Sequence, residues 1–401
     1  MVRPVCLTRF SIGALLVFTV GSPVTGQDSE ANVAPINYPQ TEATDVVDDY
    51  HGRKVADPFR WLEETESKQT AAWIAAQNKV TNRYLESIPE REKMRKRLEQ
   101  LLNYERFGLP DRHGSTYFYS HNDGLQDQSV YYKSESLDAP RSVLLNPNEL
   151  SEDGTVALAG TVPSEDGKLL AYGLADGGSD WRTWKIRDVA SGKDLDDLVQ
   201  WVKFSGIAWL PDSSGFFYGR YSEPTEDEVL TGTNENQQLY FHKLGDDQSK
   251  DRLILSRPDY PKWGFSPSVT DDGRYLIIQV WKGSEPKAQI FVKDLNDPNS
   301  KVQELITGFD AEYEWIGSIG DKLYFITDNQ APKRRLIAVK VGDTDRGNWQ
   351  QVIGETDDVL QSVSLFGGQF YATWLKDARG KVTRHQVDGT PIDQLELPGV
   401  G

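Results

Sequence analysis

Short apolar runs separated by polar turns fill the chain from about residue 114 onward. Six of them open in the same way, with a glycine turn followed by an apolar or aromatic strand. These openings are Gly114–Tyr119, Asp166–Tyr172, Ser214–Tyr218, Asp272–Ile278, Gly320–Ile326 and Gly367–Ala372. Measured between their glycines, the repeats are 47 to 58 residues long. That period fits four short strands with their turns, which is one blade of a β-propeller.

A further strand follows the opening strand in five of the repeats, after a loop. These strands are Ser129–Tyr132, Trp184–Arg187, Gln238–Phe241, Gln289–Val292 and Leu336–Val339. We therefore predict a mainly β fold, an incomplete β-propeller of about six four-stranded blades over residues 109–401. The alternative is a β-sandwich with an accidental spacing, which explains six similar openings less well.

The segment before the repeats has a helical pattern instead. Ser67 can cap a helix that runs toward Glu86, and Pro89 suits the first turn of a second helix. We predict a flexible lead-in over residues 27–44 and an N-terminal helical segment over residues 45–108. Both helices have an apolar side, so they need a partner surface on which to bury it.

The first 26 residues have the pattern of a secretory signal peptide. Two arginines precede an apolar run over residues 10–20, and small residues follow before Gln27. A membrane anchor is the alternative, but this run is shorter than the roughly 20 residues that a bilayer requires. The pattern predicts an exported protein, periplasmic or secreted, without a membrane span.

Composition narrows the function classes. The formal net charge is −17, which argues against a nucleic-acid partner, because phosphate contacts need clusters of lysine and arginine. Cys6 is the single cysteine, so no disulfide and no cysteine metal site is expected. The five histidines lack metal-ligand spacing, and the acidic runs lack a calcium-loop pattern. We predict no metal and no cofactor.

The chain resembles the prolyl oligopeptidase family over residues 38–400. The resemblance rests on ordered multi-residue matches, which include Tyr50–Gly52, Val55–Glu63, Gly124–Gln128, Leu150–Leu158, Ser164–Gly167 and Gly178–Trp181. It implies a serine-type endopeptidase that cleaves short peptides after proline. In that family, N-terminal helices pack on a C-terminal α/β-hydrolase domain. A seven-bladed propeller sits over the active site and restricts entry to small peptides.

The catalytic residues of such an enzyme are not apparent in this chain. The chemistry needs a serine on a strained strand-to-helix turn, a histidine base and an orienting carboxylate. No serine here has glycine at both i−2 and i+2, and Ser318, the nearest match, belongs to a predicted blade turn. The resemblance places the three catalytic residues beyond the propeller. We therefore expect an N-terminal fragment that is inactive alone, whose α/β-hydrolase partner domain is missing or separately encoded.

The resemblance also implies three substrate-binding residues. Phe204 matches the family's pocket phenylalanine, and Gly264 and Ser284 match two further pocket positions. For Phe204 a core strand aromatic is an equally good interpretation. Relatives can carry larger apolar residues at the other two positions, so a thinner pocket wall is expected here. Trp181 and Trp263 are assigned to blade packing.

Two function classes stay open at this point. The first is the substrate-gating part of an exported prolyl oligopeptidase that acts on short proline-containing peptides. The second is a non-enzymatic exported propeller that serves as a binding or scaffolding module. A downstream reading frame that encodes a glycine-rich serine elbow, then aspartate and histidine, would favour the first.

Overall fold

The computed structural model describes residues 36–225 and 228–399. The chain divides into two compact units, one up to Gln100 and one from Leu101 onward. The predicted signal peptide and the first part of the lead-in lie outside the described residues. None of the helices in the described ranges is long and apolar enough to cross a membrane.

The first unit contains a β-hairpin and two helices. Its elements are β1 (Val47–Tyr50), β2 (Arg53–Ala56), a 3-10 turn η1 (Arg60–Glu63), α1 (Lys68–Glu86) and α2 (Arg91–Leu102), which runs across the boundary. The predicted cap of the first helix is confirmed, because Ser67 Oγ accepts a hydrogen bond from the Thr70 backbone N–H at 3.1 Å. This bond satisfies one of the free donors at the helix start.

Helix α2 presents an apolar side that the rest of the helical unit leaves largely uncovered. Four of its side chains are more than half exposed, namely Met94, Leu98, Leu101 and Leu102. They are spaced at three, four and seven residues, so they lie on one side of the helix. An uncovered stripe of this kind marks a surface that another protein segment can cover.

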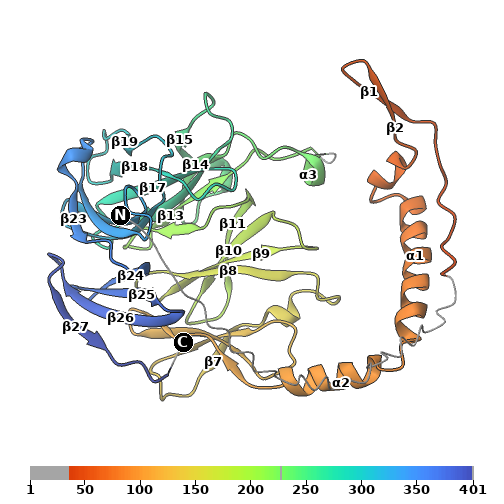
Figure 1. Cartoon of the computed structure of the whole chain (residues 1–401), viewed down its shortest axis with the longest axis horizontal. Coiled ribbons are helices and arrows are strands. Elements are labelled where there is room, and N and C mark those ends of the chain that lie inside the picture. Colours follow the sequence, from red (N-terminus) through yellow and green to blue (C-terminus); the bar gives the residue numbers. More distant parts are fainter. Residues whose placement is uncertain (1–35, 226–227, 400–401) are drawn as a thin grey trace, which may run out of the picture. The chain divides into compact units, whose positions relative to one another are not determined.

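The second unit is a six-bladed β-propeller (Figure 1). Blade 1 comprises β3 (Arg106–Phe107), β4 (Asp111–His113), β5 (Thr116–Asn122), β6 (Val130–Ser134) and β7 (Ser142–Leu145). Blade 2 comprises β8 (Ala157–Pro163), β9 (Leu169–Ala175), β10 (Arg182–Asp188) and β11 (Asp194–Val202). Blade 3 comprises β12 (Ile207–Trp209), β13 (Gly215–Arg220), β14 (Gln238–Lys243) and β15 (Arg252–Ser256).

The remaining blades repeat the four-stranded pattern. Blade 4 comprises β16 (Trp263–Val269), β17 (Tyr275–Lys282), β18 (Gln289–Asp294) and β19 (Gln303–Ile306). Blade 5 comprises β20 (Tyr313–Ile319), β21 (Lys322–Thr327), β22 (Arg335–Lys340) and β23 (Gln350–Ile353). Blade 6 comprises β24 (Val359–Phe366), β25 (Gln369–Lys376), β26 (Arg379–Gln386) and β27 (Pro391–Leu395). Short helical turns interrupt the links at η2 (Pro147–Glu149), α3 (Glu228–Thr231), η3 (Gln248–Lys250) and η4 (Arg346–Asn348).

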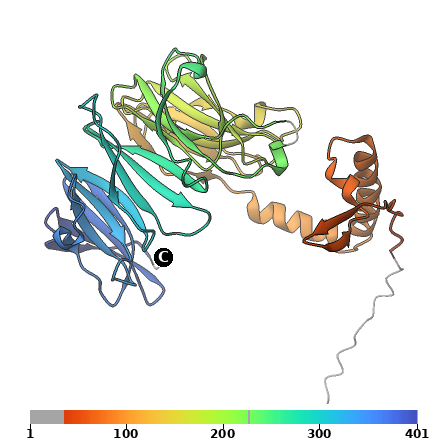
Figure 2. The same ribbon diagram turned by 90° about the horizontal axis from the view of Figure 1, so that it is seen from above.

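All pairings within the blades are antiparallel, so each blade is an up-and-down sheet (Figure 2). The predicted number of blades is confirmed, but their phase differs from the sequence-based expectation. The glycine turns do not open the blades. Gly167, for example, lies between the first and second strands of blade 2, and Gly273 lies at the same place in blade 4. The first strands of blades 2, 4, 5 and 6 are seven or eight residues long and end before the glycine turn, whereas that of blade 3, Ile207–Trp209, has three residues.

The middle strands of the blades read as continuous apolar runs because both of their faces are covered. Residues Gly215–Gly219 of β13 and Leu323–Thr327 of β21 are buried without alternation. One side chain faces the preceding blade and the next faces the following blade. A strand in this position gains burial energy from every residue, about 1.5–3 kcal/mol for each large apolar side chain.

Five apolar cores join the six blades in sequence order. Phe118 and Tyr172 belong to the core between blades 1 and 2, and Leu360 and Phe370 belong to the core between blades 5 and 6. The other three cores link blades 2 to 5 in the same way. Between the described residues of blades 6 and 1, by contrast, no hydrogen bond, ion pair or shared core is found. The two end blades also carry highly exposed apolar residues, among them Phe366 and Leu109.

Candidate functional site

Phe204 lies in the short link between β11 of blade 2 and β12 of blade 3. Its φ angle is 54°, in the left-handed region that residues with a side chain rarely adopt. Its side chain is 42 % exposed, so it is not the core strand aromatic that was the alternative interpretation. An exposed aromatic ring in a strained backbone conformation persists only where its surroundings fix it.

Hydrogen bonds on both sides of Phe204 provide that fixation. The buried amide of Gln237 donates from Nε2 to the Lys203 carbonyl at 2.8 Å. Its Oε1 accepts from the Phe265 backbone N–H in β16 at 2.5 Å. On the other side, Ser205 Oγ accepts from the Gly219 backbone N–H at 2.9 Å. The link is therefore tied to blades 3 and 4, and Phe204 is held outward between two anchored neighbours.

Gly264 lies in β16, next to the residue that Gln237 holds. It pairs directly with Trp281 of β17 across the antiparallel ladder. A Cβ atom at Gly264 would lie 2.0 Å from Cζ2 and 2.2 Å from Cε2 of the Trp281 indole. The space that a side chain at this position would take is thus already filled by the indole. The expectation of a thinner wall at Gly264 is wrong for this reason, since a neighbouring strand supplies the bulk.

Trp281 connects the two predicted residues. Its ring stands at 89° to the ring of Phe204, with centroids 6.0 Å apart. This edge-to-face arrangement is the one that the charge distribution of aromatic rings favours. Sequence reasoning did not identify Trp281 or Gln237 as part of the site. The available signal was the register of the β16–β17 hairpin, which places a glycine opposite a tryptophan.

Ser284 lies apart from this group in the described contacts. It is exposed in the turn that follows β17, directly after Gly283, which has a φ of 60°. It makes no hydrogen bond to another described residue. The structure therefore brings Phe204 and Gly264 together through Trp281, and it leaves Ser284 three residues further along the chain.

A second aromatic group adjoins the same link. The Lys203 ammonium lies 3.9 Å from the ring centroid of Trp181 and 3.3 Å from Asn234 Oδ1. Trp181 also packs edge-on against Trp201 and Tyr221. Burial lowers the pKa of Lys203, although the charge of Asp180 opposes this shift. Lys203 and its neighbours Trp181 and Asn234 pack against the link, in keeping with the packing role expected for Trp181.

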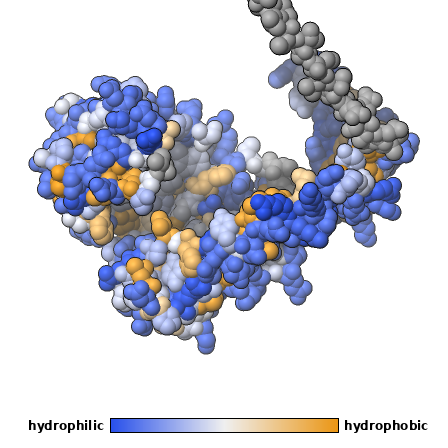
Figure 3. All heavy atoms as spheres, turned by 60° about the horizontal axis from the view of Figure 1, so that its bottom comes forward, coloured by the Kyte–Doolittle hydropathy of each residue, from blue (hydrophilic) through white to orange (hydrophobic). Residues whose placement is uncertain are grey.

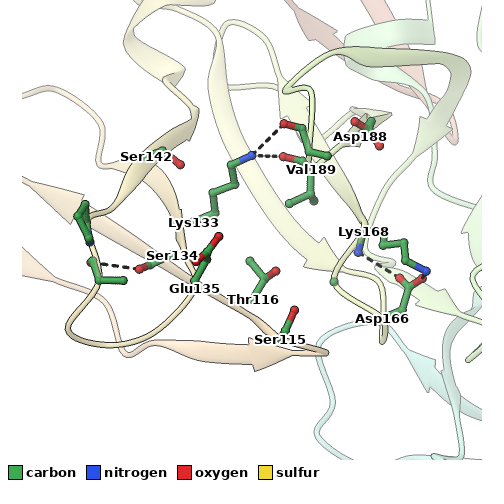
Figure 4. Close-up of a pocket in the computed structure, with 14 residues that line it drawn as sticks. Ser115, Thr116, Lys133, Ser134, Glu135, Ser142, Asp166, Lys168, Asp188 and Val189 are labelled. Carbon is green, nitrogen blue, oxygen red and sulfur yellow. Dashed lines mark hydrogen bonds and ion pairs between the residues drawn. The ribbon is translucent and has the colours of Figure 1, made fainter.

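A polar cleft of about 600 Å³ lies elsewhere, between blades 1 and 2 (Figure 4). The Lys133 ammonium points across it and donates to the carbonyls of Val189 and Ala190. Lys168 pairs with Asp166 at 3.0 Å. The Lys133 ammonium is thus held by backbone carbonyls and Lys168 by a carboxylate, while Glu135 and Asp188 add further carboxylates to the lining. Its residues also lack the aromatic rings that characterise the Phe204 site.

Groups suited to hydrolytic or metal chemistry do not converge in the described ranges. No cluster of three histidine, cysteine, aspartate or glutamate residues there is arranged to hold a metal ion. Four of the five histidines bond to other groups, as His242 does with Asp251 at 2.7 Å and His385 with Thr383 at 2.8 Å. Ser318 lies within β20 and not on a turn into a helix. The arrangement of Phe204, Gly264 and Trp281 can bind an apolar side chain.

Comparison with known proteins identifies the family to which this propeller is similar. Residues 38–401 match the family model described as "Prolyl oligopeptidase, N-terminal beta-propeller domain". A prolyl endopeptidase of Elizabethkingia meningoseptica is 38 % identical over 373 residues, which cover 93 % of this chain and 52 % of that protein. Prolyl oligopeptidase A of Galerina marginata is 32 % identical over 403 residues, covering 92 % of this chain and 54 % of that protein.

Solved structures agree with these relatives. Prolyl oligopeptidase B from Galerina marginata, bound to a 25mer macrocyclization substrate, superposes with a TM-score of 0.80 at 27 % identity. That match covers 92 % of this chain and 55 % of the other. A prolyl endopeptidase structure matches with a TM-score of 0.69 at 38 % identity, covering 91 % of this chain and 52 % of the other. The chain spans about half the length of the relatives it matches, and it belongs to the N-terminal β-propeller domain family of the prolyl oligopeptidases.

Proposed function

We propose that this chain is the substrate-gating part of a serine-type prolyl endopeptidase and that it binds short proline-containing peptides at Phe204. The observation that carries the proposal is the presentation of Phe204 itself. A half-exposed aromatic ring with a φ of 54° is anchored through Gln237 and Ser205 instead of being folded into the core. Strain of this kind concentrates at ligand-binding positions.

The catalytic residues belong, in this proposal, to an α/β-hydrolase domain that acts together with this propeller. The uncovered apolar side of α2 supports such a partner. Covering a side chain such as Leu98, now 55 % exposed, would remove apolar surface from water and favour association. Peptide binding then resides in the propeller, and bond cleavage resides in the partner domain.

Activity measurements test this division. Residues 27–401 alone should not hydrolyse a chromogenic peptide with proline before the scissile bond, because loss of a catalytic triad costs about 10⁶ in kcat. Adding a separately expressed α/β-hydrolase domain of a prolyl endopeptidase should restore turnover. Phe204→Ala should then lower kcat/KM by about tenfold, the value of a lost aromatic contact.

Two controls make the outcome decisive. Phe366→Ala removes an exposed phenylalanine from blade 6 and should leave kcat/KM unchanged. Leu98→Glu should weaken the restoration by the hydrolase domain without altering the propeller. Turnover by the chain alone that a serine-directed reagent inhibits would contradict the proposal. Peptide binding without any restored cleavage would favour the alternative, a non-enzymatic binding module.

Export is part of the same proposal and rests on the pattern of residues 1–26. Cleavage of a signal peptide should give a native protein whose first residue lies near Gln27. Mass spectrometry of the protein from its own cells measures that terminus directly. An intact N-terminus at Met1 or Val2 on cytosolic protein would contradict export.

A further inference from the structure

We propose that Trp281 is a further peptide-contacting residue, which forms with Phe204 a two-ring corner for an aromatic or bulky apolar side chain of the peptide. The inference rests on the proposed function, because it deepens the same site. It assigns Gly264 a new role as the seat of the indole, meaning the bare backbone against which the indole packs. Substrate selectivity at this corner would then depend on Trp281, a residue that neither the sequence pattern nor its immediate neighbours single out.

The seat is defined by the β16–β17 register. Gly264 and Trp281 are direct cross-strand partners, so their side-chain positions lie on the same face of the sheet. An added Cβ at Gly264 would lie within 2.4 Å of three indole atoms. The indole therefore lies flat across the bare backbone of Gly264. Glycine is needed here for close approach, since its φ is not in the left-handed region.

The seated indole and the ring of Phe204 then meet at a right angle. Their planes are inclined by 89° and their centroids are 6.0 Å apart. A third ring that enters such a corner can stack on one wall while it meets the other edge-on. Both arrangements are favourable for aromatic pairs. A small peptide side chain would gain neither contact.

The indole N–H adds a hydrogen-bond donor at this place. Trp281 is only partly buried, and its Nε1 donates to no other described residue. A free donor beside an apolar corner suits a peptide, which offers a backbone carbonyl next to each side chain.

A fluorine-NMR titration of the whole chain tests the assignment. The protein is labelled with 5-fluorotryptophan, and Trp281→Phe identifies the resonance of residue 281. Two acetylated, amidated tripeptides serve as probes, Phe-Ala-Pro and Gly-Ala-Pro. We expect the Trp281 signal to shift with the first peptide, and we expect that peptide to bind about 2- to 12-fold more tightly than the second.

Variants separate the contributions. Trp281→Ala should remove the preference for the phenylalanine peptide, so that the two peptides bind with similar affinity. Gly264→Ala should move the Trp281 resonance even without peptide, because the indole loses its seat. Phe366→Ala, on blade 6, is the matched control and should alter neither affinity.

The outcomes test the role of Trp281 separately from the proposed peptide-binding function. If Phe204→Ala weakens binding but Trp281→Ala keeps the full preference, the inference is overturned and the proposed function stands. An unmoved Trp281 resonance in Gly264→Ala would refute the seating role. Absence of binding for both peptides, up to their solubility limits, would overturn the inference and the proposed function together.

Discussion

Replacing His242 by glutamine tests the buried network that ties blade 2 to blade 3. His242 is fully buried in β14 and lies between two carboxylates. Its Nδ1 is 2.7 Å from Asp251 Oδ1, and its Nε2 is 3.1 Å from Asp197 Oδ1. Asp251 also accepts from the Tyr218 hydroxyl at 2.5 Å, and Asp197 accepts from the Gly245 backbone N–H at 2.6 Å. The imidazole therefore gives each carboxylate a further hydrogen-bond partner and links the two blades.

The direction of the pH effect follows from the surroundings of the imidazole. Burial alone would lower the pKa of His242, but hydrogen bonding and attraction from Asp251 and then Asp197 outweigh it and raise that pKa. A raised folded-state pKa gives stability that is complete below the unfolded value near 6.5. That stability is lost as the pH rises through the raised value. The imidazolium thus contributes most at mildly acidic pH.

The expected cost follows from the burial of the pair. Removing one partner of a buried ion pair costs about 3–5 kcal/mol, because the remaining charge stays buried and unpaired. We expect His242→Gln to lose that amount at pH 6. Above the raised pKa only hydrogen bonds of a neutral imidazole are lost, so the loss should shrink to about 1–2 kcal/mol.

Urea unfolding at pH 6 and pH 9, followed by circular dichroism and by tryptophan fluorescence, measures the difference. Both signals must coincide before a free energy of unfolding is derived, since repeat proteins can unfold in stages. His385→Gln is the control, because His385 is also buried but its partners are the neutral Thr383 hydroxyl and Gly389 carbonyl. Equal losses for His242→Gln at the two pH values would refute the reasoning.

Three further predictions concern other parts of the propeller. Asp166 is partly buried, which alone would raise its pKa, but hydrogen bonds from Ser164 and the Lys168 backbone lower that pKa to about 2. The stability difference between the wild type and Asp166→Asn should therefore be constant above the ordinary aspartate value and shrink between about pH 4 and pH 2 in thermal melts. Gly173→Ala should cost about 1–3 kcal/mol in urea unfolding, because its Cβ would lie 2.9 Å from the Trp184 ring, and a loss below 0.5 kcal/mol would contradict this packing argument. Backbone amides of blades 1 and 6 should exchange with deuterium faster than those of blades 3 to 5, and uniform exchange would show that the end blades are as well supported as the central ones. In the same end blades, exposed Phe366 should bind a hydrophobic dye that Phe366→Ser no longer binds.

Most of the surface in the view of Figure 3 is hydrophilic, with separate hydrophobic patches. Such patches are common on soluble proteins, so their presence alone does not define an interface. The uncovered side of α2 differs because four apolar side chains recur at helical spacing. Measurement of hydrolase-domain binding with Leu98→Glu is therefore more informative than patch size.

The repeat, the glycine turns and the helix cap could be predicted from the sequence. Glycine turns such as that at Gly273 are set by a left-handed φ of 71°, and the capping serine Ser67 acts within its own helix turn. Both are short-range effects, so neighbouring residues suffice to predict them. The phase of the blades was harder, because a glycine turn marks a hairpin but does not show which of the four strands of a blade follows it.

The site was predictable only in part. Phe204 and Gly264 could be placed by resemblance, but the indole between them comes from a residue seventeen positions after Gly264. Its contribution depends on strand register and on a ring orientation, and neither is a local property. Gln237 is likewise remote in sequence from both groups that it bridges. Long-range packing of this kind is decided by the folded sheet and not by residue type.

The pairing of Gly264 with Trp281 has a consequence for how this surface can change over evolution. A side chain at position 264 collides with the existing indole, and a smaller residue at position 281 leaves the glycine backbone bare. Residues in such contact show coupling energies of about 0.5–3 kcal/mol. Each single exchange therefore passes through a less fit intermediate. The two positions should be inherited as a pair, and among homologues a bulky residue at one should accompany a smaller or more flexible residue at the other.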